Sequence, residues 1–110
     1  MSNSREKGKR GERRCVHWVQ PIYPDAHRSA DQARDNRHCD VEGTPYWIEV
    51  KEGLQPNLFA ALEQALRDRG AVGDSRPIMV FAHRTKAEGR PAHTVVLMLA
   101  NEFMAELLMR

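Results

Sequence analysis

The alternating segment at residues 46–51 limits the possible folds of this chain more than any other feature. Its even-numbered positions are apolar or aromatic, whereas Glu49 and Lys51 occupy odd-numbered positions. Successive side chains of an extended strand point to opposite faces, so the pattern predicts a strand with Glu49 and Lys51 on one face. The turn residues 42–45 precede it, and residues 38–41 are expected to pair with it as an antiparallel strand.

The remaining segments predict a mixed sheet with helices on its faces. Helical periodicity marks residues 7–20, 57–69 and 102–109, with Asn101 as the expected cap of the last helix. Apolar runs predict strands at 78–83 and 94–99, an extended segment is expected at 23–29, and the polar residues 31–37 predict an exposed loop. This order indicates an α/β fold. A chain of 110 residues holds one core, so a single domain is expected over residues 7–110, after a flexible tail of residues 1–6.

The composition favours a globular, cytoplasmic protein. Hydrophobic residues make up 41% and charged residues 29% of the chain, a balance unlike that of disordered proteins. Apolar runs are all far shorter than the roughly 20 residues of a membrane span, and the polar N-terminus does not resemble a signal peptide. In a reducing cytosol, Cys15 and Cys39 are expected to be small buried hydrophobes.

Two carboxylates and an ammonium group are expected to converge on the sheet. Asp40 lies on the strand that pairs with Glu49 and Lys51, and it is expected on their face, with Cys39 and Val41 turned the other way. Neighbouring carboxylates repel each other unless a proton or a cation intervenes. Mg²⁺ binds one or two carboxylates, keeps several waters and accepts a phosphate oxygen. The pattern therefore predicts metal-assisted hydrolysis of a phosphodiester, in which Lys51 orients the water or stabilises developing charge.

Glu12 and Gln64 support this interpretation. Glu12 shares a helical stripe with Val16 and Val19, where a carboxylate needs a partner, and Gln64 lies on the helix that follows the strand. Each residue alone has a simpler explanation as a turn residue or a solvated surface residue. The interpretation depends on the ordered combination of all of them.

This combination resembles the PD-(D/E)XK nuclease superfamily, and within it the small Holliday junction resolvase-like proteins of archaea and phages. The matching positions are Lys9-Arg10-Gly11-Glu12-Arg13, Asp40, Ile48-Glu49-Val50-Lys51 and Gln64. The resemblance implies a restriction-endonuclease-like sheet flanked by helices and dependence on Mg²⁺ or Mn²⁺. It implies catalytic roles for Glu12, Asp40, Glu49, Lys51 and Gln64, with Glu12, Asp40, Glu49 and Val50 at the metal.

The expected function is a Mg²⁺-dependent endodeoxyribonuclease of DNA recombination that cuts branched or four-way DNA as a homodimer. A basic run in the first helix is expected to contact phosphates, namely Lys7, Lys9, Arg10, Arg13 and Arg14. The last helix carries more apolar residues than one face needs, which suggests a dimer surface. Two alternatives stay open: a nicking or restriction-like DNA-processing nuclease, and a non-catalytic DNA-binding module on a nuclease fold.

Overall fold

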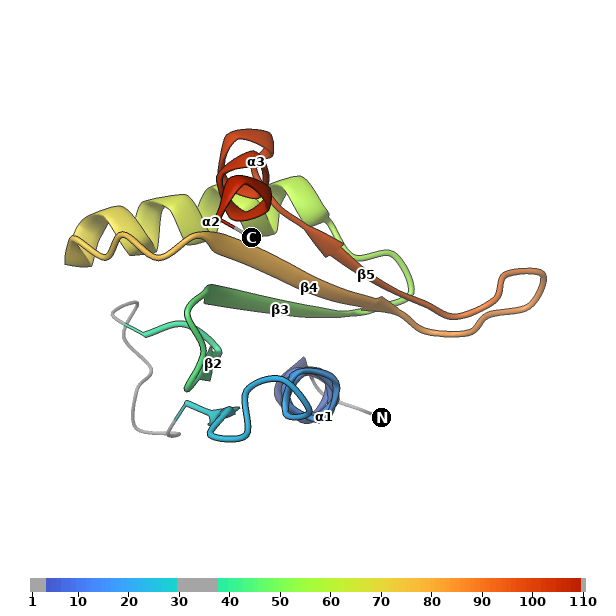
Figure 1. Cartoon of the computed structure of the whole chain (residues 1–110). Helices are drawn as coiled ribbons and strands as arrows, with labels where there is room; N and C mark the ends of the chain where they lie inside the picture. Colours follow the sequence, from blue (N-terminus) through green and yellow to red (C-terminus); the bar gives the residue numbers. More distant parts are fainter. Residues whose placement is uncertain (1–3, 30–37, 110) are drawn as a thin grey trace.

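The computed structural model describes residues 4–29 and 38–109 (Figure 1). Within these ranges the chain forms one α/β domain, a five-stranded mixed sheet with three helices, as the sequence predicts. The helices are α1 (Ser4–Val19), α2 (Leu58–Val72) and α3 (Ala100–Leu108). The strands are β1 (His27–Arg28), β2 (Val41–Glu42), β3 (Trp47–Gly53), β4 (Ile78–Arg84) and β5 (His93–Leu97).

The strands lie in the order β1-β2-β3-β4-β5. β2 pairs antiparallel with β3 as predicted, with Val41 opposite Ile48. The predicted bounds 38–41 are wrong, because β2 covers only Val41–Glu42 and Asp40 precedes it. β3 and β4 are parallel, because α2 carries the chain back to the end of the sheet where β3 begins. Their register places Lys51 beside Ala82. β5 then returns antiparallel to β4 through a hairpin that extends beyond the sheet (Figure 1).

Helices cover both faces of the sheet, with α1 on one side and α2 and α3 on the other (Figure 1). Two apolar clusters correspond to these layers. The cluster on the α2 side contains Cys39, Trp47, Ala61, Leu62, Ala65, Ile78 and Val80. The cluster on the α1 side contains Cys15, Ala26, Val41, Ile48, Val50 and Phe81. The alternation along β3 therefore divides its side chains between two cores, and Glu49 belongs to the α2 side.

α1 approaches β3 closely at Gly11. A methyl group at Gly11 would lie 3.0 Å from Val50 Cγ1 and 3.1 Å from Glu52 Cβ. These distances are tighter than ordinary van der Waals contact, so a larger residue would push the helix away from the strand. Gly11 thus sets the distance between the sheet and the neighbouring Glu12.

Both cysteines are free and buried, which confirms their predicted role as small hydrophobes. Burial raises the pKa of the Cys15 thiol to about 12 and that of Cys39 to about 11, so both remain protonated at neutral pH. Each cysteine belongs to a different apolar cluster.

The structure shifts several of the predicted helix boundaries. α1 begins at Ser4, so the helix includes part of the expected tail, and the predicted loop at 31–37 lies outside the described residues.

Asn57 caps α2 as expected of a residue at the start of that helix, since its Oδ1 accepts a hydrogen bond of 3.0 Å from Ala60 N. The predicted cap of α3 is wrong. Leu99 occupies the N-cap position and Asn101 lies inside the first turn, because the chain enters the helix directly from β5.

None of the helices in the described parts of the chain is long and apolar enough to cross a membrane.

Candidate active site

Counting backbone and side chain together, Glu49 is the one charged residue among the described positions that the fold buries, with 7% of its surface exposed. It projects from β3 toward α2, in the middle of the sheet. Burial first, and then the nearby charge of Asp40, raise the pKa of this carboxyl group to about 8, although the charge of Lys51 opposes the shift. The pKa of this carboxyl group, ordinarily 4.5, therefore lies close to neutral pH. Burying the ionised carboxylate costs folding free energy.

Asp40 lies immediately before β2 and reaches the edge of β3. Its backbone N–H donates to Ile48 O at 2.9 Å, and its Oδ2 accepts from Val50 N at 2.7 Å. The carboxylate thus accepts the hydrogen bond of a β3 amide that has no backbone partner on β2. Burial raises the pKa of Asp40 to about 6, while the Val50 amide lowers it and the charge of Glu12 raises it.

The predicted side-chain directions around Asp40 are wrong in one respect. Cys39 and Val41 are both buried, but they belong to clusters on opposite faces of the sheet. The Asp40 carboxylate lies at the edge of β3, where it accepts the hydrogen bond from Val50 N, and its charge acts on Glu49 from there. The electrostatic coupling expected between Asp40 and Glu49 is present all the same.

Lys51 follows Glu49 by two residues on β3 and is partly exposed. Its positive charge lowers the pKa of both Asp40 and Glu49. The ammonium group is therefore electrostatically linked to both acids, as the alternation in the sequence predicts. Its partial exposure leaves it able to meet a ligand from solution.

Glu12 approaches the acids from the α1 side. Its charge raises the pKa of both Asp40 and Glu49, which places it in their electrostatic neighbourhood. Its Oε1 accepts a hydrogen bond of 3.0 Å from Arg28 Nε on β1. The partner expected for this carboxylate is thus provided, in this structure, by an arginine that the sequence analysis did not consider.

Asp68 on α2 is a member of the acidic group that the sequence analysis missed. Its charge raises the pKa of Asp40 and of Glu49. Gln64 lies one helical turn earlier and is partly buried, so the two residues share a side of α2. The four-residue spacing between them is the signal that could have identified Asp68.

The chemistry of these side chains, though not their present arrangement, suits a hard divalent cation. Carboxylate oxygens are the ligands that Mg²⁺ prefers, and a positive charge between Asp40 and Glu49 would offset the burial that disfavours their ionisation. Among the described residues, no group of three or more acidic, histidine or cysteine side chains is arranged closely enough to hold a metal as it stands. The acids that could hold one are Asp40 and Glu49, with Glu12 after release from Arg28 and with the Val50 backbone beside them.

Another carboxylate, that of Glu52, pairs with two arginines of the basic run in α1. Its side chain is 1% exposed and accepts hydrogen bonds from Arg10 Nε at 3.2 Å and from Arg14 Nε at 3.0 Å. These two arginines therefore hold α1 against β3, in addition to any contact with a ligand. Arg13 is exposed, and Lys7 and Lys9 are partly exposed.

Comparison of the chain with protein families, with curated proteins and with solved structures finds no match.

Proposed function

We propose that this protein is a metal-dependent endodeoxyribonuclease that hydrolyses phosphodiester bonds. The observation that carries the proposal is the buried Glu49 carboxylate, coupled to Asp40 at the edge of β3 and followed two residues later by Lys51. A structural role explains this arrangement poorly, because a buried acid beside a second, partly buried acid weakens a fold unless a ligand compensates them.

The acidic residues and the lysine would have different roles. Asp40 and Glu49 would hold Mg²⁺ or Mn²⁺, and Glu12 and the Val50 backbone would complete the metal site. The cation supplies Lewis acidity toward the phosphate and lowers the pKa of a bound water. Lys51 binds the scissile phosphate electrostatically and stabilises the negative charge that grows on it. The hydrogen bond from Val50 N fixes the Asp40 carboxylate in place, so its oxygens need no reorganisation on binding.

The proposed substrate is branched DNA, and the proposed active form is a homodimer. A four-way junction offers two strands to cut, and two copies related by a two-fold axis would present two equivalent sites. The end of the chain supports a contact surface, because several of its apolar side chains are 40% exposed or more: Phe103, Met104, Leu107, Leu108 and Met109. We define these five residues as the α3 surface.

A cleavage assay tests the proposal. Purified protein is incubated with supercoiled, linear and four-way DNA in Mg²⁺, Mn²⁺ or EDTA. Metal-dependent cutting of the four-way DNA, abolished in Glu49→Gln, is the expected result. Cutting of all DNA forms alike would favour a nicking or restriction-like nuclease. Binding without cutting in either metal would favour a non-catalytic DNA-binding module.

A further inference from the structure

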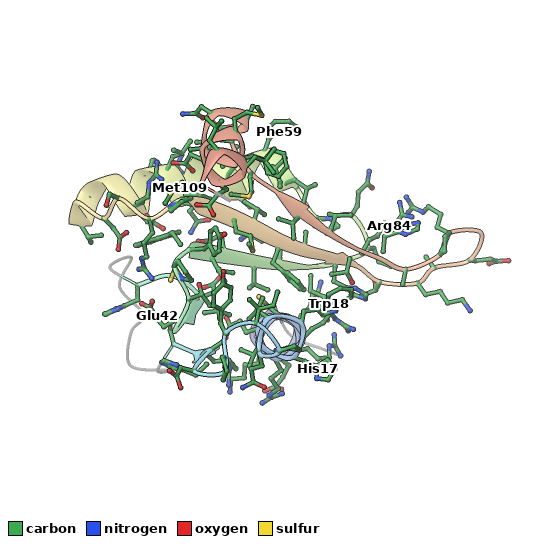
Figure 2. All side chains as sticks on the ribbon, viewed as in Figure 1. His17, Trp18, Glu42, Phe59, Arg84 and Met109 are labelled. Carbon is green, nitrogen blue, oxygen red and sulfur yellow. The ribbon has the colours of Figure 1, made fainter. Side chains whose placement is uncertain are left out.

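A hollow lies where the β4–β5 hairpin leaves the sheet. Its volume is about 320 Å³, and it is bounded by the segment after β3, the start of α2 and the two strands. Its lining residues are Gln55, Pro56, Leu58, Ala82, Arg84, Arg90, His93 and Val95. Figure 2 shows Arg84 at the base of this hairpin, far along the strand from the α3 surface.

The polar part of the hollow is basic. Arg84, Arg90 and His93 contribute to its lining, and none of the lining residues is acidic. Arg84 donates from Nη2 to Pro91 O at 3.1 Å, but its buried Nε has no hydrogen-bond partner among the described residues. The positive charges of Arg84 and Arg90 favour a ligand that brings an anionic acceptor oxygen.

The rest of the hollow is apolar. Pro56, Leu58, Ala82 and Val95 provide most of this surface. A simple inorganic anion would use the arginines and leave these walls in contact with water. A ligand with both a flat apolar part and an anionic part would use both halves, and a nucleotide with its base and phosphate has that composition.

The hollow is adjacent to the candidate active site. Ala82 on β4 is the register partner of Lys51 on β3, so their side chains leave the same face of the sheet from neighbouring strands. Neighbouring strands are about 4.8 Å apart. A DNA strand whose phosphate contacts Lys51 therefore has the hollow within reach of a nearby nucleotide.

We propose that the hollow binds one unpaired nucleotide of the DNA strand, with the base against the apolar walls and the phosphate on Arg84 and Arg90. This inference rests on the proposed function, since it assigns a part of the substrate to a surface beside the same site. It also gives a physical basis for selecting branched DNA, because a base pair at the branch point opens more readily than one within an intact duplex.

The test measures binding in EDTA, so that nothing is cleaved. A fluorescent single-stranded oligonucleotide of thymidines is titrated with the wild type, with Arg90→Gln and with Lys86→Gln. Arg90 and Lys86 are both exposed residues of the same hairpin, and each substitution removes one positive charge, but only Arg90 lines the hollow. Circular dichroism confirms that both variants are folded.

Arg90→Gln is expected to weaken binding about fivefold, and Lys86→Gln by less than about twofold, because only the former removes a charge-assisted hydrogen bond to the bound phosphate. An oligonucleotide without bases should bind the wild type about tenfold more weakly, since it buries no apolar surface against the aliphatic walls. Equal effects of the two substitutions, or equal affinity for the oligonucleotide without bases, would overturn the inference.

These outcomes are separable from failure of the proposed function. A wild type that binds as expected but cuts no DNA in Mg²⁺ or Mn²⁺ would refute the nuclease and support the hollow as a nucleotide-binding site. A wild type that cuts four-way DNA, with equal binding by the Arg90 and Lys86 variants, would refute the hollow alone.

Discussion

The carboxylate of Asp40 accepts a hydrogen bond of 2.7 Å from the backbone amide of Val50, on the strand that also carries Glu49. This contact links the residue immediately before β2 to the middle of β3. It keeps one acid beside another although burial disfavours the ionisation of both. The relationship between Asp40 and Val50 therefore sets the geometry on which the first predictions depend.

The first prediction concerns the acids themselves. Asp40→Asn and Glu49→Gln should each reduce cleavage by at least about 100-fold, because each removes a negative metal ligand with little change in volume. The amide oxygen of an asparagine can still accept the hydrogen bond from Val50 N, so Asp40→Asn should stay folded. Rates on four-way DNA, measured beside thermal unfolding, check this. Turnover near that of the wild type in either folded variant would remove these residues from the site.

The second prediction separates Lys51 from the metal ligands. Lys51→Ala should lose most cleavage yet retain metal binding, because an ammonium group is not a ligand and its removal leaves the carboxylates in place. Isothermal calorimetry with Mn²⁺ measures the binding. Lys86→Ala, at an exposed lysine of the hairpin, is the matched control and should keep both properties. Loss of metal binding in Lys51→Ala alone would contradict the assigned role.

The third prediction concerns pH. The folded state raises the pKa of Glu49 from 4.5 to about 8, so it holds a proton that the unfolded chain releases between these values. The free energy of unfolding of the metal-free protein should therefore fall as pH rises through this range, by at most about 1.4 kcal/mol per pH unit for one proton. Urea unfolding in EDTA at pH 5, 6, 7 and 8 measures the slope.

Metal should reverse this dependence, because it binds the ionised carboxylates and so stabilises the folded protein more at pH 8 than at pH 5. Glu49→Gln provides the control, since an amide does not titrate and the slope should become shallower. A metal-free protein whose stability rises with pH over the same interval would argue against a buried, protonated Glu49.

The fourth prediction concerns the basic helix. Neutralising Lys7, Lys9 and Arg13 together should weaken DNA binding and reduce its salt dependence, because fewer counterions are released on binding. Arg14→Gln should instead lower the thermal stability, since it takes one of two arginine partners from the buried Glu52 carboxylate. If the salt dependence of DNA binding is unchanged in the triple variant, these residues of α1 are an ordinary solvated surface.

The fifth prediction concerns the α3 surface. Leu108 is 83% exposed, so Leu108→Glu should leave the monomer intact and abolish a dimer that uses this surface. Sedimentation at micromolar concentration, with and without four-way DNA, measures the oligomeric state. Leu54→Glu is the control, because Leu54 is 59% exposed on the segment between β3 and α2. A wild type that is monomeric under both conditions would favour a monomeric nickase.

Local pattern determined most of the fold. The alternation at residues 46–51 identified β3 and the common face of Glu49 and Lys51, since side-chain direction in a strand depends only on position. Asn57 and Gly73, at the two ends of α2, act through contacts within a few residues, so the limits of that helix are a local property. The α/β class follows from the order of such elements.

The tertiary structure alone decided the contacts between distant segments. The Asp40 carboxylate joins the Val50 amide across a strand pair, Arg28 reaches Glu12 from β1, and Glu52 holds two arginines of α1. Asp68 enters the acidic group because α2 packs on β3 in one particular position. Periodicity reports which face a residue occupies along its own element, but not which residue of another element lies opposite. That information arises only when the helices settle on the sheet.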